Sequence, residues 1–468
     1  MIAINVWRGS GWVIAAAVGL VAVPAMAADQ AKPWRLDEAL APQDWLQLGG
    51  SYRVRYETLD NAYRASDVGS GDILVERLLL NVRAGSDRFY ADAELEDSRQ
   101  QLADSQTALG TDIVNTLEPL QAYLGARFKD ALSPGDHLDL QLGRMTIDNG
   151  SRRLVARNSF RNTINAFTGI HATWQSAGGR EVQAMFVEPV QRLPSDFTAL
   201  KDNDHQLDTD SSDVELWGLF TSWPKLAGRL AGEAYFYGSR AHDHPGIPAA
   251  DRKLYTPGAR LYSKPAAGAW DMEAEGAWQF GTSRASTAAS DTRDLHQRAG
   301  FFHGDVGYTL SGRMSPRVEL SYDYASGDHD PTDGQNNRFD TLYGARRFDF
   351  GPTGIYGAFA RANISTPGVR LQLKPSADLS AMAGLRAVWL ASDRDQYTTA
   401  KLQDATGHSG SFVGDQLEAQ LQYNVLPGNL ALDLGGAWLM HGHFLEHAPH
   451  APDEGDTTYL YAAATFTF

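Results

Sequence analysis

The sequence has 468 residues, of which 43% are apolar and 21% charged, and its net charge at pH 7 is −16. The mean hydropathy of −0.35 excludes a polytopic helical membrane protein. The lack of cysteine excludes thiol catalysis, disulfides and cysteine-ligated metals. The acidic balance argues against nucleic acid as a partner.

The N-terminal residues have the features of a secretory signal peptide rather than a buried helix. Arg8 is the only charged residue in this stretch, Gly11–Val23 is an apolar run, and Ala25-Met26-Ala27 is a small-x-small cleavage site. The sequence therefore predicts a signal peptide over residues 1–27 and a mature chain, 28–468, that forms a single domain.

The mature chain alternates apolar and polar residues in segments of about ten residues. The first segment runs from Leu46 to Glu57, where Tyr52 and Val54 share one face and Arg53 and Arg55 share the other. The same alternation returns at residues 76–84, 89–98, 120–129, 270–280, 317–325, 413–423, 430–440 and 458–468.

These segments predict an all-β fold, a transmembrane antiparallel β-barrel of 16–18 strands. Aromatic residues lie at segment ends, and the last segment ends on the aromatic Phe468, as in outer-membrane barrels. Short links such as 84–88, 226–228 and 426–429 alternate with long polar links, which is the asymmetry between periplasmic turns and outer loops. With 16–18 strands, the chain allows about 24–28 residues per strand and connection, and a barrel of this size encloses an aqueous channel.

The alternation also predicts which charges face the channel. Arginine on the lipid face costs about 2–4 kcal/mol at the bilayer midplane, so the polar faces must point inward. We expect the following strand residues to line the lumen: Arg53, Arg55, Arg77, Arg83, Arg127, Arg370 and Arg386.

The densest basic segment runs from Arg144 to Arg161 and does not alternate. It is predicted to be a strand end that continues into a loop folded into the lumen. Its arginines are Arg144, Arg152, Arg153, Arg157 and Arg161, and no acidic residue lies between Arg152 and Arg161. A basic constriction would attract anions. The alternative is that interior arginines pair with interior carboxylates for structural reasons alone.

Other chemistry has weaker support in the sequence. The pairs His242/His244 and His441/His443, and the acidic loop Asp328–Gly334, are predicted to be solvated rather than to bind a metal. No motif of a nucleophile elbow, phosphate loop or zinc protease occurs, so the sequence predicts neither a cofactor nor an enzyme.

Two sets of motifs resemble the alginate export family of outer-membrane β-barrel proteins. The first set comprises Gly143-Arg144, residues 150–155, Arg161-Asn162 and residues 167–169, and the second comprises residues 322–328 and 338–344. The resemblance implies an 18-stranded monomeric barrel whose arginine-rich pore passes an anionic uronate polymer.

The expected function is therefore an outer-membrane channel for an anionic polysaccharide or oligosaccharide, with outer-membrane lipid around it. The alternative is a diffusion porin for small anionic or neutral solutes, which needs the same barrel but no polymer. An outer-membrane enzyme is the third hypothesis, and no motif supports it.

Overall fold

The structure is a computed structural model that describes residues 32–40, 43–65, 70–243, 249–453 and 455–468. The predicted signal peptide lies outside the described residues. Among the described residues, no helix has the length and apolar character to cross a bilayer. The helices are short: α1 (Leu36–Leu40), α2 (Phe197–Asp202), α3 (Arg347–Phe350) and α4 (His443–His447).

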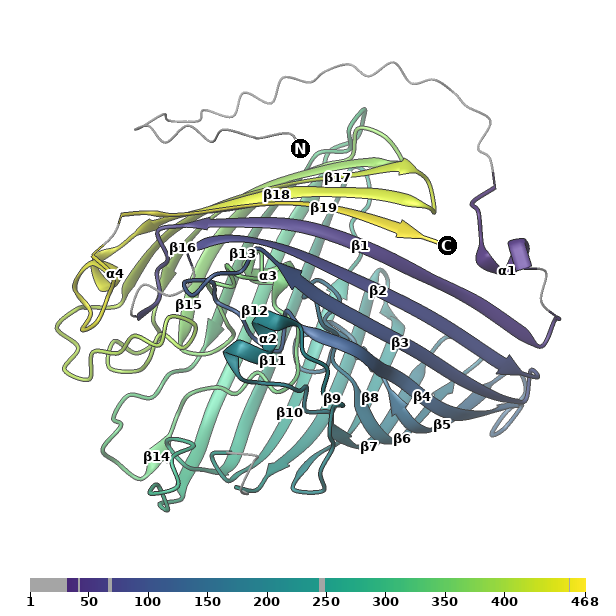
Figure 1. Cartoon of the computed structure of the whole chain (residues 1–468), viewed down its shortest axis with the longest axis horizontal. Helices are drawn as coiled ribbons and strands as arrows, with labels where there is room; N and C mark the ends of the chain where they lie inside the picture. Colours follow the sequence, from purple (N-terminus) through teal and green to yellow (C-terminus); the bar gives the residue numbers. More distant parts are fainter. Residues whose placement is uncertain (1–31, 41–42, 66–69, 244–248, 454) are drawn as a thin grey trace.

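Strands make up most of the described chain (Figure 1). In chain order they are β1 (Leu46–Asp60), β2 (Gly71–Gly85), β3 (Phe89–Gln101), β4 (Asn115–Lys129), β5 (His137–Met145), β6 (Phe167–Gln175), β7 (Glu181–Pro189), β8 (Val214–Ala227), β9 (Leu230–Ala241), β10 (Arg252–Ser263), β11 (Ala269–Ser283), β12 (Leu295–Thr309), β13 (Arg317–Ala325), β14 (Gln335–Asn336), β15 (Ile364–Leu373), β16 (Leu379–Trp389), β17 (Phe412–Leu426), β18 (Leu430–His441) and β19 (Thr457–Thr467).

The wall is a closed antiparallel barrel of 18 strands. Each strand pairs with its neighbours in the sequence, β13 pairs directly with β15, and β1 pairs with β19 to close the ring. The two-residue β14 is separate, because it belongs to the connection between β13 and β15 and pairs in parallel with β12. The predicted fold class is confirmed, and the strand number is the upper end of the predicted range.

Side chains alternate across the wall as the sequence predicts. In β13, Leu320 is 63% exposed on the outer face, whereas Arg317 and Asp323 are buried on the inner face. An exposed apolar exterior is the face that meets lipid. Leu120 departs from the predicted pattern, because the β3–β4 register shifts between Glu94 and Leu95. Leu120 is therefore buried, in a cluster with residues of the loop that enters the lumen.

The connections differ in length at the two ends of the barrel (Figure 1). One end has short turns such as 86–88, 228–229 and 427–429, and the other has long loops such as 190–213 and 390–411. By this asymmetry the short turns lie on the periplasmic side. The longest connection between wall strands is residues 326–363.

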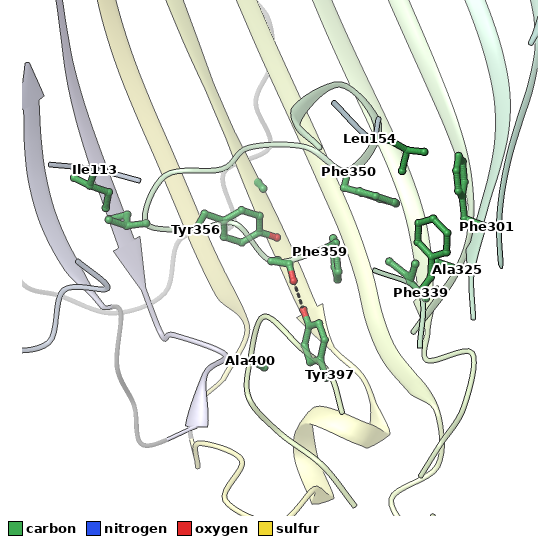
Figure 2. Packing of buried hydrophobic residues seen from close by; sticks show 14 of the residues in the cluster. Ile113, Leu154, Phe301, Ala325, Phe339, Phe350, Tyr356, Phe359, Tyr397 and Ala400 are labelled. Carbon is green, nitrogen blue, oxygen red and sulfur yellow. Dashed lines mark hydrogen bonds between the residues drawn. The ribbon is translucent and has the colours of Figure 1, made fainter. Parts of the chain in front are cut away.

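Two long connections fold into the barrel and fill part of its interior. Residues 146–166 join β5 to β6, and residues 337–363 join β14 to β15. Their apolar side chains pack with other loops into a buried cluster inside the wall (Figure 2). Tyr356 and Phe359 belong to this cluster, and Tyr397 donates a hydrogen bond to the carbonyl of Ala358 at 2.9 Å. The core of this protein therefore lies in the lumen.

The described N-terminal segment lies against the end of β19. The Trp34 ring packs on Phe466 and Phe468 with ring centroids 6.2 Å apart in both cases. The Trp34 backbone N–H donates to Asn429, whose side-chain amide donates back to the Trp34 carbonyl. These contacts hold residues 33–35 at the periplasmic end, where β18 and β19 meet β1.

Candidate functional site: the lumen and its periplasmic vestibule

Three of the predicted strand arginines hold the folded-in loop in place. Arg53, Arg55 and Arg77 are buried on the inner faces of β1 and β2. Arg53 and Arg77 both donate to the carbonyls of Ser159 and Arg161, at distances of 2.7–3.1 Å. Arg55 donates to the Phe160 carbonyl at 2.6 Å and pairs with Glu57. Their guanidinium groups thus satisfy backbone oxygens that the loop would otherwise leave unpaired in the interior.

Arg153 is the centre of a larger buried network. It donates two hydrogen bonds of 2.9 Å to Asp349 of α3, and it also pairs with Glu273 and Glu275 of β11. Arg361 pairs with the same Asp349. One guanidinium therefore joins the loop 146–166, the loop 337–363 and the barrel wall.

The other arginines of the basic segment divide between paired and unpaired positions. Arg144 pairs with Glu118 at 2.6 Å and Arg157 pairs with Glu94 at 2.9 Å. Arg161 is 3.9 Å from Asp112. The segment contains no acid between Arg152 and Arg161, but the wall and the neighbouring loops supply the acids to these residues.

The remaining strand arginines also have partners inside the barrel. Arg83 pairs with Asp92 and Arg127 pairs with Asp139, both at 2.9 Å near the periplasmic rim. Arg370 lies 3.2 Å from Glu319. Arg386 donates to the carbonyl of Asp349 and so adds another contact between the wall and α3.

Arg152 differs from its neighbours in the segment. Its side chain is exposed, and among the described residues it has no ion-pair partner. Its guanidinium lies 5.2 Å from the Phe348 ring centroid, a stacking distance. The positive φ of Arg152, 65°, turns the backbone there, so that Arg152 and Arg153 direct their side chains to different surroundings.

Arg152 lines a cavity of about 910 Å³ inside the periplasmic half of the barrel, which we call the vestibule. Its floor is the two folded-in loops, and its wall is formed by the periplasmic ends of β12, β13 and β15–β18 and by the β10–β11 turn. The lining includes five cations and two acids: Arg152, Arg317, Arg347, Arg370 and Lys374, with Asp148 and Asp433. Arg317, Arg347 and Arg370 pair with carboxylates behind the lining, so Arg152 and Lys374 carry the positive charge that has no carboxylate partner among the described residues.

Two aromatic rings lie among these cations. Phe160 packs edge-on against Tyr461, and the Arg347 guanidinium lies 4.9 Å from the Phe160 ring centroid. The Arg152 guanidinium lies over the Phe348 ring, and both residues line the vestibule. Alternating rings and guanidinium groups present both apolar and charged surface to a molecule in the vestibule.

Sequence reasoning missed three of the vestibule cations. Arg317 was visible in the alternating pattern of 317–325, whereas Arg347 and Lys374 follow no strand periodicity and have no local signal. Lys374 lies in the β15–β16 turn, is exposed, and has no ion-pair partner among the described residues. The neighbouring Arg346 does not line the vestibule. It is enclosed in the loop layer, where it donates to the Phe359 carbonyl at 3.0 Å. Burial there lowers the pKa of Arg346 to about 10.

Among the described residues, two groups have the spacing of metal ligands, and both contain His303. One adds Glu273 and Asp305, and the other adds Asp323 and Asp349. The carboxylates of Glu273 and Asp349 already pair with Arg153, and His303 contacts Asp323 at 2.7 Å. We interpret this cluster as part of the structural charge network, because the neighbouring guanidinium groups would oppose a divalent cation.

The comparisons with known proteins agree with this architecture. The barrel is similar to OccAB1 of Acinetobacter baumannii, with a TM-score of 0.57, 13% identity, and 94% and 99% of the two chains covered. It is also similar to OpdK of Pseudomonas aeruginosa, solved with vanillate, with a TM-score of 0.56, 12% identity, and 90% and 98% covered. It is similar as well to the outer membrane protein OprD of Pseudomonas aeruginosa, with a TM-score of 0.54, 12% identity, and 91% and 94% of the two chains covered.

At this identity the structural likeness establishes the fold. A comparison with proteins of curated function finds no match. The model of the family described as "Alginate export" matches residues 44–455, nearly the whole of the described barrel. The barrel is closed, with an apolar exterior and a charged interior. Together with this family match, these features identify the protein as an outer-membrane channel rather than an enzyme. The chain belongs to the alginate export family.

Proposed function

We propose that this channel passes an anionic polysaccharide or oligosaccharide of the uronate class through the vestibule. The observation that carries the proposal is the vestibule lining, in which five cations face two acids. Arg152 and Lys374 are the cations that a substrate can engage most directly, because no carboxylate among the described residues pairs with them. The aromatic rings of Phe160 and Phe348 lie in the same lining and suit the apolar faces of sugar rings.

The predicted site residues take different roles in this proposal. Arg152 and Arg370 would contact the substrate, since both line the vestibule. The paired arginines that hold the loops, among them Arg53, Arg77 and Arg153, would set the shape of the pathway and add to its positive field. We also propose that the barrel acts as a monomer, is the single domain of the mature chain, and binds no metal or cofactor.

Conductance in planar bilayers tests the function. We expect the wild-type channel to prefer anions and to be blocked by an oligouronate added on the periplasmic side. The double variant R152A/K374A should weaken that block by about tenfold, because two unpaired charges are lost from a focused field. The matched control is K129A/K225A, which removes two exposed cations that do not line the vestibule. Cation preference in the wild type, or an equal loss in both double variants, would contradict the proposal.

A diffusion porin for small anionic or neutral solutes is the second candidate. It is favoured by the likeness to OpdK, which was solved with vanillate, a small carboxylate. The vestibule volume of about 910 Å³ suits a molecule of that size as well as a polymer segment. Liposome swelling separates the two candidates: rapid uptake of small carboxylates with no block by an oligouronate would favour the porin.

A further inference from the structure

A second cavity lies at the periplasmic rim, on a different arc of the wall from the vestibule. It has a volume of about 380 Å³ and is lined by residues of β1–β4, their turns and the segment before β1. We call it the rim cleft, and its principal residues are Trp45, Gln47, Arg83, Asp87, Tyr90 and Arg127. The wall of the vestibule is instead formed by β12, β13, β15–β18 and the β10–β11 turn. The two cavities share no lining residue.

The rim cleft is built around the ring of Tyr90. The Arg83 and Arg127 guanidinium groups lie 4.6 and 5.1 Å from its centroid. Its hydroxyl donates to Asp139 at 2.7 Å, and its ring lies so close to Gly125 that a Cβ there would come within 2.1 Å of Cζ. Glycine at 125 therefore allows the ring to lie flat against β4, and the hydrogen bond fixes its position.

The charges of the rim cleft are balanced, in contrast to those of the vestibule. Its lining contains two arginines and two acids, Asp44 and Asp87. Arg83 and Arg127 are in addition paired with Asp92 and Asp139 behind the lining. Small anions gain little from such a surface, because the nearby carboxylates offset the attraction of the guanidinium groups.

The same groups retain hydrogen-bonding capacity toward a neutral ligand. Arg83 uses Nε and Nη2, and Arg127 uses Nε and Nη2, on protein acceptors. In the described part of the chain, Nη1 of each arginine has no hydrogen-bond partner. The side chains of Arg83 and Arg127 are 35% and 40% exposed. Gln47 adds an amide, and Trp45, 56% exposed, adds a large unoccupied aromatic face.

We propose that the rim cleft is a carbohydrate subsite that holds one pyranose ring by its hydroxyl groups and its apolar face. Planar guanidinium, carboxylate and amide groups match neighbouring sugar hydroxyls, which both donate and accept. The C–H face of the ring packs on Trp45, as apolar groups pack on aromatic surfaces. This inference rests on the proposed function and deepens it: the vestibule would bind the charged groups of the polysaccharide, and the rim cleft would bind one of its sugar rings.

Isothermal titration of the full-length, detergent-solubilised barrel tests the inference with three probes. These are a neutral mannohexaose, a mannuronate hexamer and hexaglutamate, which has the charge but no sugar ring. W45A should weaken binding of both hexaoses by about tenfold and leave hexaglutamate unchanged, because only the sugars use the aromatic face. R83K, which keeps the charge but loses the planar fork, should weaken the neutral hexaose in the same way.

The matched control is W270A, on the exposed face at the start of β11, where Trp270 is 67% exposed and lines neither cavity. It should leave all three affinities unchanged. A heat-modified gel shift confirms that each variant barrel is folded, and W45F, which keeps a ring, should restore part of the affinity. No binding of mannohexaose to the wild type, equal effects of W45A and W270A, or an equal loss for hexaglutamate would overturn the inference.

The design separates this inference from the proposed function. R152A/K374A should weaken mannuronate and hexaglutamate but not mannohexaose. If the wild type binds no polyanion while W45A still weakens mannohexaose, the proposed function fails and the subsite stands. If polyanion binding depends on Arg152 and Lys374 while W45A changes nothing, the subsite fails alone.

Discussion

Arg153 and Asp349 join the two loops that fold into the lumen, through a bidentate ion pair with both N–O distances at 2.9 Å. The residues are separated by 196 positions in the chain. Burial opposes ionisation of Asp349, but the charges of Arg153, His303 and Arg361 hold its pKa below its usual range. The loop layer is therefore held by charges that do not titrate in the physiological range.

Replacing Arg153 by alanine should release this layer. The variant leaves Asp349, Glu273 and Glu275 without their shared guanidinium, and breaking a buried pair in this way costs about 3 kcal/mol or more. We expect R153A to make residues 146–166 and 337–363 susceptible to protease and to increase current noise in single-channel recordings. R152A removes the neighbouring, exposed charge and is the control; equal protease sensitivity of the two variants would contradict the role assigned to Arg153.

Gly344 should not tolerate a side chain. A Cβ at this position would lie 1.8 Å from the carbonyl oxygen of Arg153, a backbone atom that cannot move aside without shifting its loop. G344A should therefore lower the temperature of the heat-modified gel shift. G276A, whose Cβ would meet the Phe301 carbonyl at an ordinary 3.5 Å, should leave it unchanged. A wild-type transition in G344A would show that the two loops are not packed as described.

Asp208 should make the loop 190–213 sensitive to pH. Burial raises its pKa to about 6, and its contacts with Asn115 and the Leu193 N–H only partly offset this. Because the folded loop favours the protonated form, this contribution to stability is full below the unfolded pKa of about 4 and is lost as pH rises through about 6.

Limited proteolysis of that loop at pH 5 and pH 7.5 measures the effect. The wild type should be cleaved relatively faster at pH 7.5, and D208N, which cannot ionise, should lose most of the difference. D202N, an exposed position on α2, corrects for the pH dependence of the protease itself. A pH response that persists unchanged in D208N would assign the effect to another group.

Inverting the two unpaired vestibule charges should invert the ion preference. R152E/K374E changes the lining from five cations and two acids to three cations and four acids. Reversal potentials under a salt gradient should move from anion toward cation preference, and the shift should shrink at high ionic strength because salt screens exposed charge. K129E/K225E, at exposed positions outside the vestibule, should produce a much smaller shift.

Local periodicity is why much of the wall could be predicted. The expected segment 317–325 coincides with β13, and the arginines expected to face inward in β1 and β2 do so. Period-two alternation is a property of each strand alone, so it is readable without knowing the partners. The bulge at Leu120 shows the limit of this reading, since one extra residue reversed the face and the neighbouring Pro119 was its only sequence signal.

The site was less predictable because its contacts are distant in sequence. Glu273, which pairs with Arg153, is 120 positions away, and no spacing rule connects the two. The basic cluster was visible, but the sequence could not tell that Arg152 faces the vestibule while Arg153 is enclosed. The turn residue Lys374 joins the vestibule because the neighbouring strands β12–β18 end at the same rim, beside the folded-in loop that carries Arg152.

The pairing of β1 with β19 has a consequence for biogenesis. The ten residue pairs of this seam join the first strand of the wall to its last strand, so the ring cannot close before β19 has been synthesised. A truncation that removed β19 would leave β1 and β18 with unsatisfied amide and carbonyl groups in hydrocarbon, where each such group costs several kcal/mol. Closure of the ring must therefore wait until β19 has been synthesised, and a frameshift just before β19 would be as damaging as an early one.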